Sequence, residues 1–446
     1  MKDRDNNNAK DRLMSERKVN KNVAEVRDEQ GLPVAPFPED DDFSKLDERF
    51  GDRGKNKYYS KVSAGYRNVK LVLIVLLVAV VLFALLLGAD NFTYANLRYL
   101  LRNFGEATVN DTDLAETIEF DIDADISVGV FGGKLAVAGE ESFALYRMSG
   151  KKVYSEASEY RESIISCGEK YTVLWSYGER SIYVYNAVSL IHKETFERPV
   201  YGVAVDDKGG CAVLTGDELY AGTIRLYTAD FRLALTKNIA AGNVAHVELS
   251  DDGSRMTTAI FNTRDGEYVS SFAVSDTKNG IELFSFEYPA ELALKTGFFA
   301  NGGSFCLTDR SLYIYGADGT VLHSARIPER LKMVYSDSKH VCTVSNRGVS
   351  LPENTVQVVS SEGSVVSVFT WGSAISDVCL TSEYVFLLGP TVRCVSLEDG
   401  SRTDIARDGS ADTLLSFEDC VYCIYPDRAE LIFNDGKPII HETDDK

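Results

Sequence analysis

From residue 117 onward, one arrangement of hydrophobic and polar residues recurs along the chain. Each copy has an apolar strand ending in an aromatic residue or valine, a turn that usually contains Asp or Gly, and a second apolar strand. The residue before the turn lies 36 to 47 positions after its counterpart in the previous copy, 41 on average. The eight counterparts are Tyr146, Tyr185, Tyr227, Val274, Tyr315, Val359, Val395 and Phe433. A period of this length is typical of four-stranded propeller blades.

Two further apolar runs precede each of these hairpins. In the fifth copy they are LKTGFFA and GSFCLTD, and in the seventh they are AISDVCL and YVFLLG. Eight copies of 41 residues need 328 residues, and the stretch from Thr117 to Ile440 spans 324. The pattern therefore predicts an all-β fold, an eight-bladed β-propeller over residues 117–440. Seven blades is the alternative, if two copies merge.

Burial on both faces and closure of the ring follow from the same pattern. Strands such as IYVYN are apolar on both faces, whereas a lone sandwich would leave one polar face in water. Turns such as Asp318-Gly319 and Asp435-Gly436 supply the positive φ angles of tight hairpins. The segment Thr117–Ile122 alternates apolar and acidic residues. We predict that it pairs with the last copy near Ala429–Phe433, which removes an open edge.

A different pattern precedes the repeats, an uninterrupted apolar run from Leu71 to Ala89. A helix of this length measures about 28 Å, close to the hydrocarbon thickness of a bilayer. Six cations precede the run within residues 51–70 and two follow it within 90–110, which predicts a cytoplasmic N-terminus. Some seventy residues precede it, so we expect an uncleaved transmembrane signal anchor over 67–90 and an extracytoplasmic propeller. A buried soluble helix is the alternative.

The segments around the anchor have simpler patterns. Residues 1–66 contain 14 basic and 14 acidic side chains and no apolar period, which predicts a disordered cytoplasmic tail. A docking motif within it is the alternative. Residues 91–116 are predicted to be a juxtamembrane amphipathic helix and linker, because Leu97, Leu100, Leu101 and Phe104 share one helical face. This face could lie at the membrane interface or pack under the propeller. Residues 441–446 form a C-terminal tail.

Composition and charge narrow the classes of partner. Of 446 residues, 47 are basic and 67 acidic, which gives a net charge of −20. Nucleic acids and anionic lipids require basic surfaces, so we expect neither as the main partner. The apolar share of 44% indicates globular material, and together with a mean hydropathy of −0.13 it excludes a polytopic membrane protein. The expected partners are the membrane, through one helix, and an envelope protein or glycan.

Sequence motifs for catalysis, cofactors or metals are absent from the chain. It has no G-x-S-x-G, G-x-G-x-x-G, P-loop or H-E-x-x-H motif. The histidines are scattered over different copies at no ligand spacing: His192, His246, His323, His340 and His441. The Asp-Gly clusters at 206–209 and 251–253 lack the ligand alternation and terminal Glu of an EF-hand, so we interpret them as turns. We predict no enzyme and no catalytic, cofactor-binding or metal residues.

The eight cysteines all follow the predicted anchor, where disulfides are permitted: Cys167, Cys211, Cys306, Cys342, Cys379, Cys394, Cys420 and Cys423. Several fall in or beside the second strand of their copies, which indicates a small buried apolar slot that suits a free thiol. Cys420 and Cys423 have C-x-x-C spacing, but on a strand these positions point to opposite faces, which argues against a redox pair or zinc site. We expect at most one or two disulfides.

The anchor, the NLRYLLRN segment at 96–103 and the Y-x-x-x-G hairpins resemble an uncharacterised Firmicutes family of single-pass membrane proteins. The resemblance implies an extracytoplasmic β-propeller-like domain of unknown function, and it brings no catalytic residues. The copies are also similar to WD-type and quinoprotein-type propellers. However, the chain lacks the Trp-Asp dipeptide of the first and the tryptophan docking motif of the second, and Trp175 and Trp371 are its only tryptophans.

Three functions compete on this basis. A binding or scaffolding module of the cell envelope needs only a rigid disc with loops on two faces. An enzyme, such as a quinone-dependent dehydrogenase or a glycan-cleaving propeller, would need carboxylates, Arg or His to converge near the ring centre. A transmembrane sensor would need the tail 1–66 to pass a signal inward. The sequence favours the binding module.

Overall fold

A computed structural model describes residues 69–78, 114–120, 126–328, 330–346, 353–406 and 411–439. Contacts divide the chain into two compact units, Met1–Asn91 and Phe92–Lys446. In the first unit, residues 69–78 are helical. Among the described residues, no helix combines the length and hydropathy needed to cross a bilayer. The tail 1–66, most of the apolar run, and the expected helix at 92–104 lie outside the described residues.

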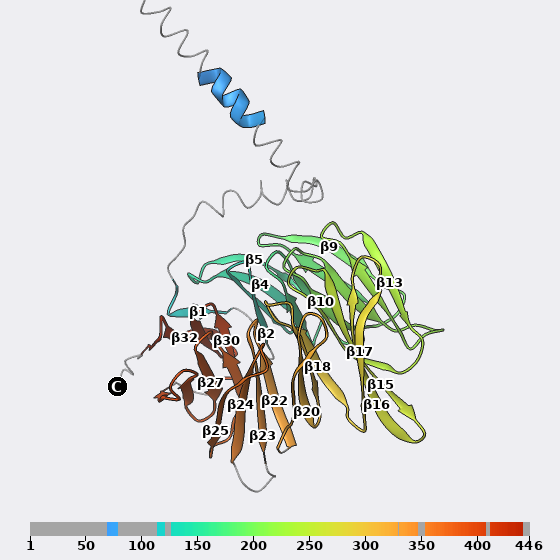
Figure 1. Cartoon of the computed structure of the whole chain (residues 1–446). Coiled ribbons are helices and arrows are strands. Elements are labelled where there is room, and N and C mark those ends of the chain that lie inside the picture. Colours follow the sequence, from blue (N-terminus) through green and yellow to red (C-terminus); the bar gives the residue numbers. More distant parts are fainter. Residues whose placement is uncertain are drawn as a thin grey trace, which may run out of the picture. The chain divides into compact units, whose positions relative to one another are not determined.

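The described residues of the second unit are all β and form eight sheets arranged in a ring, each of which is one blade (Figure 1). Blade 1 contains β2 (Ser127–Phe131), β3 (Lys134–Gly139), β4 (Ser142–Arg147) and β5 (Lys152–Ala157). Blade 2 contains β6 (Ile164–Cys167), β7 (Thr172–Trp175), β8 (Ser181–Tyr185) and β9 (Leu190–Thr195). Blade 3 contains β10 (Val200–Val205), β11 (Cys211–Thr215), β12 (Gly222–Tyr227) and β13 (Leu233–Ile239). Blade 4 contains β14 (Asn243–Leu249), β15 (Arg255–Arg264), β16 (Glu267–Asp276) and β17 (Glu282–Pro289).

The next three blades repeat this order. Blade 5 contains β18 (Ala293–Phe298), β19 (Ser304–Thr308), β20 (Ser311–Tyr315) and β21 (Val321–Arg326). Blade 6 contains β22 (Arg330–Ser336), β23 (His340–Asn346), β24 (Asn354–Ser360) and β25 (Val365–Trp371). Blade 7 contains β26 (Asp377–Leu380), β27 (Tyr384–Leu388), β28 (Val392–Ser396) and β29 (Arg402–Ile405). The first strands of neighbouring blades contact each other, so they are innermost.

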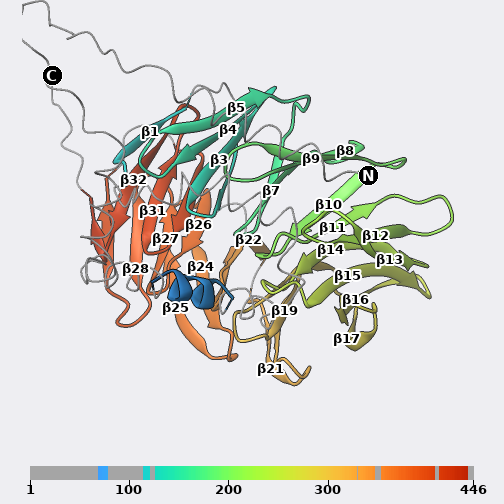
Figure 2. The same cartoon turned by 90° about the horizontal axis from the view of Figure 1, so that it is seen from above.

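Blade 8 combines the two ends of the domain. Its strands β30 (Thr413–Phe417), β31 (Cys420–Ile424) and β32 (Arg428–Asn434) come from the C-terminal end, and β1 (Thr117–Glu119) supplies the outer strand (Figure 2). Ile118 pairs with Ala429 in an antiparallel register. A two-residue strand, β33 (Lys437–Pro438), pairs with another part of β32. The predicted closure near Ala429–Phe433 is confirmed, and with it the eight-bladed fold.

The predicted hairpins are also confirmed. All eight residues of the sequence repeat lie on the third strand of their blades, from Tyr146 on β4 to Phe433 on β32. The runs expected in the fifth and seventh copies are the first two strands of blades 5 and 7. Aromatic residues at these positions fill space between blades: Tyr185 stacks on Phe143 of blade 1, with ring centroids 4.1 Å apart.

The core is divided into slabs between blades. The buried apolar side chains of the described residues form eight clusters, one between each pair of neighbouring blades. On β8, Ile182 and Val184 pack toward blade 3, while Tyr183 and Tyr185 pack toward blade 1. Each strand therefore buries both faces, which is why its sequence is continuously apolar.

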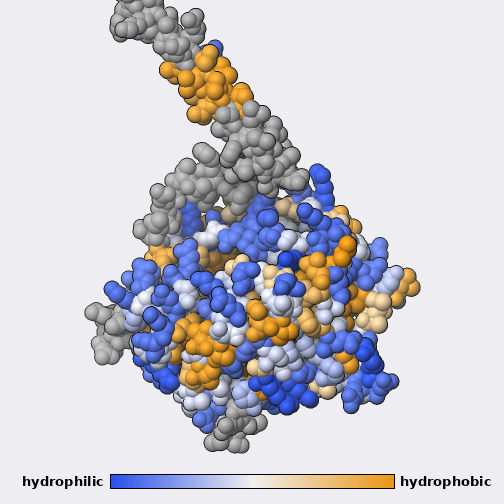
Figure 3. Space-filling view, in the orientation of Figure 1, coloured by the Kyte–Doolittle hydropathy of each residue, from blue (hydrophilic) through white to orange (hydrophobic). Residues whose placement is uncertain are grey.

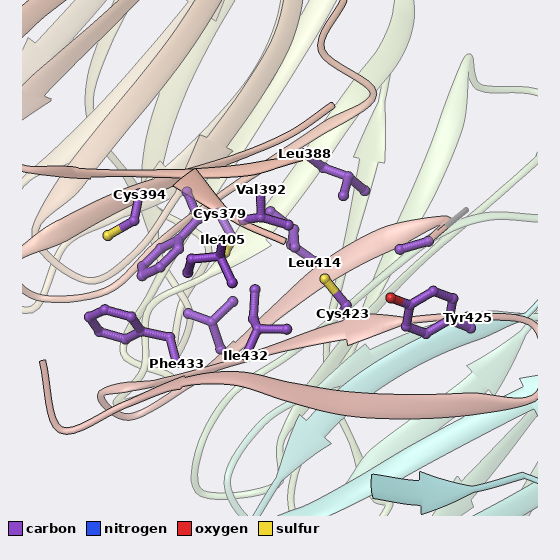
Figure 4. Packing of buried hydrophobic residues seen from close by; sticks show 13 residues of the cluster. Cys379, Leu388, Val392, Cys394, Ile405, Leu414, Cys423, Tyr425, Ile432 and Phe433 are labelled. Atoms are coloured by element: carbon purple, nitrogen blue, oxygen red, sulfur yellow. The ribbon is translucent and has the colours of Figure 1, made fainter. Parts of the chain in front are cut away.

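The cysteines are part of these slabs. All eight are free thiols, and every one except the half-buried Cys167 is buried. Figure 4 shows Cys379, Cys394 and Cys423 in the apolar cluster between blades 7 and 8. Cys420 belongs instead to the cluster between blades 8 and 1, so the two cysteines of the C-x-x-C pair face opposite ways, as expected.

Candidate functional site

Nine acidic side chains gather on one face of the propeller, in the turns that join the first strand of each blade to the second. These turns contain only three basic residues, Lys170, Lys208 and Lys339. We call the nine the acidic ring: Glu169, Asp206, Asp207, Asp251, Asp252, Asp337, Glu383, Glu418 and Asp419. Turns of different blades thus place carboxylates near the centre of one face.

Hydrogen bonds between blades hold several of these turns together. The amide of Glu169 in blade 2 donates to Asp207 Oδ1 in blade 3, at 3.1 Å. The amide of Asp207 donates to the carbonyl of Asp251 in blade 4, at 3.0 Å. Ser382 Oγ of blade 7 donates to Asp419 Oδ1 of blade 8, at 2.9 Å. The carboxylates are therefore positioned by the scaffold.

Electrostatic repulsion acts on two members of the ring, Glu169 and Asp251. Burial raises the pKa of Glu169, and the charges of Asp207 and Glu418 raise it further. Glu418 belongs to blade 8, so this repulsion acts past blade 1, whose corresponding turn is only Gly132-Gly133. Burial likewise raises the pKa of Asp251, with contributions from Asp207 and Asp252. A cation bound here would relieve the repulsion.

A pocket of about 580 Å³ lies at the closure of the ring, beside Glu418 and Asp419. We call it the closure pocket. Its polar lining includes four carboxylates, and its apolar lining comes from β32 and the two chain ends. The lining residues are Leu114, Glu116, Glu418, Asp419, Cys420, Leu431, Asn434, Asp435 and Ile439. Strand β1 therefore does more than close the ring, since the residues before it form one wall.

Turn chemistry brings two of these carboxylates to the pocket. Glu418 lies between β30 and β31 with φ 51°, and Asp435 follows β32 with φ 47°. Positive φ is uncommon for residues with a side chain, so both turns have a conformation that glycine would normally adopt. Unlike glycine, these residues place a carboxylate at the tip of the turn.

Cys420 is a thiol on the pocket wall. Burial raises its pKa to about 11, and the nearby Asp435, Glu418 and Asp419 contribute to the rise. Its Sγ donates to Asn434 Oδ1 at 3.0 Å. The group is therefore a protonated thiol at neutral pH and a poor nucleophile.

The chemistry of the closure pocket fits a primary ammonium or a guanidinium. Leu114, Leu431 and Ile439 offer a surface for a methylene stem, and the carboxylates offer acceptors for the cationic head. Among the described residues, no group of three or more His, Cys, Asp or Glu side chains is arranged to hold a metal ion. A lysine or arginine side chain of another molecule matches this lining in charge and shape.

A second group of titratable side chains lies on the innermost strands of blades 4 and 5. Glu248 and His246 are on β14, and Lys295 is on β18. Burial raises the pKa of Glu248 to about 7 and lowers that of His246 to about 4, and nearby Lys295 acts on both. His246 Nδ1 is hydrogen-bonded to Thr296 Oγ1 at 3.2 Å. At Glu248, burial therefore outweighs the attraction of Lys295, and at His246 both effects oppose the charged form.

The histidines and Asp-Gly clusters considered in the sequence analysis make contacts within or between blades. His192 stacks on Phe231, with ring centroids 4.5 Å apart, and His323 contacts the carbonyl of Gly363. His340 contacts Asp337, and His441 lies outside the described residues. The described histidines belong to blades 2, 4, 5 and 6, as expected. Asp206 accepts the amide of Gly210 and Asp252 that of Ser254, so both Asp-Gly clusters are turns.

Sequence reasoning missed the closure pocket. Glu116 and Glu418 are some three hundred residues apart, and no local pattern links them. A usable signal was the pair of acidic residues at turn positions, Glu418 before Asp419 and Asp435 before Gly436, once blade 8 had been predicted to receive the N-terminal strand.

Comparison with known proteins identifies several solved structures with a similar fold. BamB from Moraxella catarrhalis is 12% identical, with a TM-score of 0.50, and the match covers 72% of this chain and 98% of BamB. The Dos1 propeller is 10% identical, with a TM-score of 0.51 and coverages of 74% and 97%. Sqt1 from Chaetomium thermophilum, bound to the N-terminus of the ribosomal protein L10, is 11% identical, with a TM-score of 0.51 and coverages of 71% and 98%. At these identities the likeness shows the fold alone.

Comparison of the sequence finds no curated protein with a significant match. Residues 106–406 match a family model described as "Family of unknown function (DUF5711)".

Proposed function

The chain belongs to the DUF5711 family, whose function is unknown, and on this premise we propose that it is a binding and scaffolding module that captures a basic protein segment at the closure pocket. The carboxylates and apolar wall of this pocket are the observation on which the proposal depends. In this proposal the protein binds its partner without catalysing a reaction. The similar Sqt1 is bound to a protein N-terminus, which supports a protein segment as the ligand class.

The proposal includes a location. The apolar run 71–89 anchors the chain in the cell membrane, and the excess of cations before it keeps the N-terminus in the cytoplasm. The propeller then faces the cell envelope as a single-pass protein's outer domain. An acidic ring in that position attracts basic partners at long range, and the closure pocket fixes the register of the bound segment.

Binding of octalysine to the purified full chain tests the proposal. Glu116→Gln combined with Glu418→Gln removes two charges from the closure pocket. Exposed charge pairs contribute about 0.2–1 kcal/mol each, so the double variant should bind about two- to thirtyfold more weakly. Fluorescence anisotropy of a labelled peptide measures this change. Binding should also weaken as salt is added.

The matched control removes the same charge elsewhere. Glu362 and Glu398 are exposed in the outer turns of blades 6 and 7. Replacing both with Gln should change octalysine affinity much less than the pocket variant does. Equal weakening in the two double variants would show that net charge alone attracts the peptide, and the pocket would lose its assigned role.

A further inference from the structure

Three tyrosines of the neighbouring blades 2 and 3 are exposed on the face opposite the acidic ring, and two of them are in ring contact. Tyr177, Tyr201 and Tyr220 are 67%, 41% and 40% exposed, and Leu219 beside Tyr220 is 85% exposed. We call these four residues the tyrosine patch. Hydrophilic side chains dominate much of the propeller surface in the view of Figure 3. Grouped, exposed aromatic side chains on such a surface are typical of a binding site.

Backbone hydrogen bonds hold one half of the patch in place at the junction of blades 2 and 3. Tyr177 and Gly178 lie in the turn between β7 and β8. The amide of Gly178 donates to the carbonyl of Val200 at 2.9 Å, and the amide of Val200 donates to the carbonyl of Glu179 at 2.7 Å. These bonds tie the turn to the start of β10, where Tyr201 follows Val200. The rings of Tyr177 and Tyr201 consequently lie 5.2 Å apart and are tilted by 47°.

The other half of the patch is equally fixed. A Cβ at Gly216 would lie only 3.2 Å from the ring of Tyr201, so the ring covers the start of the turn between β11 and β12. Asp217 Oδ1 accepts the amides of Leu219 and Tyr220 at 2.9 and 3.2 Å, and its Oδ2 accepts Thr223 Oγ1 at 2.8 Å. The backbone of both turns is therefore fixed before a ligand binds, which reduces the entropy lost on binding and favours affinity.

The patch is separate from the closure pocket. It is formed by turns between the second and third strands and by the start of a first strand. The acidic ring is formed by turns at the other end of the first strands. A ligand of one face therefore leaves the other face free.

The chemistry of the patch selects among the common modes of peptide recognition. An amphipathic helix needs a groove lined by aliphatic side chains, and Leu219 is the only one here. A phosphorylated segment needs a cluster of arginines, whereas the connections around the patch contain only Arg180 and Arg198, and Arg198 is ion-paired with Glu218. Strand addition needs a free sheet edge, whereas the patch is made largely of turns. The tilted, exposed rings of Tyr177 and Tyr201 instead suit a polyproline II helix, whose proline rings pack on aromatic faces and whose carbonyls accept hydrogen bonds.

The charge around the patch adds to this choice. The connections around the patch contain two basic residues, Arg180 and Arg198, and four acidic ones, Glu179, Glu197, Asp217 and Glu218, so their net charge is negative. This charge would favour a basic residue at the end of the ligand.

We propose that the tyrosine patch of blades 2 and 3 is a second binding site, which takes a proline-rich protein segment in the polyproline II conformation with a flanking basic residue. The protein then holds two partners, or two parts of one partner, on opposite faces of one rigid disc.

A decaproline peptide with one arginine at each end tests the proposal against the full chain. Tyr177→Ala and Tyr201→Ala should each weaken binding about tenfold, the usual loss for a central aromatic anchor. Leu283→Ala, which changes a 49% exposed residue on β17, is the matched control and should leave binding unchanged. Glu116→Gln with Glu418→Gln should also leave it unchanged, which separates this site from the closure pocket. Unaltered melting of each variant excludes misfolding.

Two further ligands decide what the patch recognises. A glycine-serine peptide with the same terminal arginines should bind at least tenfold more weakly than decaproline, because it has the charge without the polyproline II helix. Chitotetraose should not bind. The proposal is wrong if the two peptides bind equally, if decaproline does not bind at millimolar concentration, or if the tyrosine variants bind it normally. It is also wrong if the tyrosine variants instead lose binding of chitotetraose, which would identify a glycan site.

Discussion

In this propeller, the environment of a single residue depends on the neighbouring blade as much as on its own blade. Glu248 is an example, because its strand is the innermost strand of blade 4 and its surroundings include Lys295 of blade 5 and Asp251 of the acidic ring. The carboxyl group is charged in an unfolded chain at neutral pH. In the folded state, burial opposes this charge more strongly than Lys295 supports it.

Replacing Glu248 with Gln should therefore stabilise the protein in a pH-dependent way. The folded-state pKa of about 7 lies above the ordinary value of 4.5. Between these values the folded protein retains a proton that the unfolded chain has lost, so wild-type stability falls as pH rises, and the loss is complete above pH 7. The variant should be about 1–3 kcal/mol more stable than wild type at pH 8 and close to it at pH 4.

Urea unfolding at the two pH values measures this difference. The exposed Glu362, changed to Gln, serves as the control and should show no such pH dependence. A stability difference for Glu248→Gln that is the same at pH 4 and pH 8 would contradict the assigned cause.

At the scale of elements, one joint recurs in blades 3 to 6. In each of these blades, the turn between the third and fourth strands contains a residue of positive φ that packs on the outer strand of the preceding blade. A Cβ at Gly280 would approach Leu235, one at Gly319 would approach Phe284, and one at Gly363 would approach the carbonyl of Leu322. In blade 3 the same position is Phe231, with φ 60°, and its ring stacks on His192 of blade 2.

Alanine at Gly363 should test this joint. Gly363 has φ +82° and its Cβ would lie 2.6 Å from the backbone oxygen of Leu322, so the substitution adds a clash to conformational strain. At Gly400, φ is +71° and a Cβ meets nothing within 4 Å, so only the strain remains. We expect Gly400→Ala to cost about 1 kcal/mol and Gly363→Ala about 2–4 kcal/mol of unfolding free energy in denaturant. Equal costs would show that the joint adds nothing.

The strands and turns of this structure could be predicted from the sequence. The strand pattern and the turn residues are local, because each depends on residues within one hairpin. The closing segment pairs with a distant strand, but its own alternation of apolar and acidic residues marks it as an outermost strand. The pocket-lining set of Glu116, Glu418 and Asp435 and the contacts of Tyr201 with Gly216 depend on which turns meet in space. No period in the sequence encodes those meetings, and the patch tyrosines have no repeat counterpart that could have revealed them.

At the scale of the whole molecule, stability depends on closing the ring. Ile118 is fully buried, and it packs in the cluster between blades 8 and 1. Nearby, the amide of Phe120 donates to the carbonyl of Asp427, and Tyr422 Oη donates to the carbonyl of Ala115. The three-residue strand β1 is thus held by both backbone pairing and apolar packing.

Ile118→Ala should reveal how much this short strand contributes. The change leaves a cavity in a buried cluster, so we expect a loss of about 2–5 kcal/mol. Limited proteolysis should then cut first near residue 117. Ile281→Ala changes a 59% exposed residue beside β17 and is the control, with an expected cost below about 0.5 kcal/mol. If both variants melt alike, β1 is dispensable for closure.

The pairing of Thr117 with Glu430 also determines when during synthesis the ring can close. A ribosome adds about 5–20 residues per second, so the partner strand emerges roughly 15–60 s after β1. During that interval, seven blades can form while β1 has no strand to pair with. The first strand of the nascent chain therefore stays unpaired until β32 has been made, and a truncation that removes β32 would leave β1 without its pairing partner.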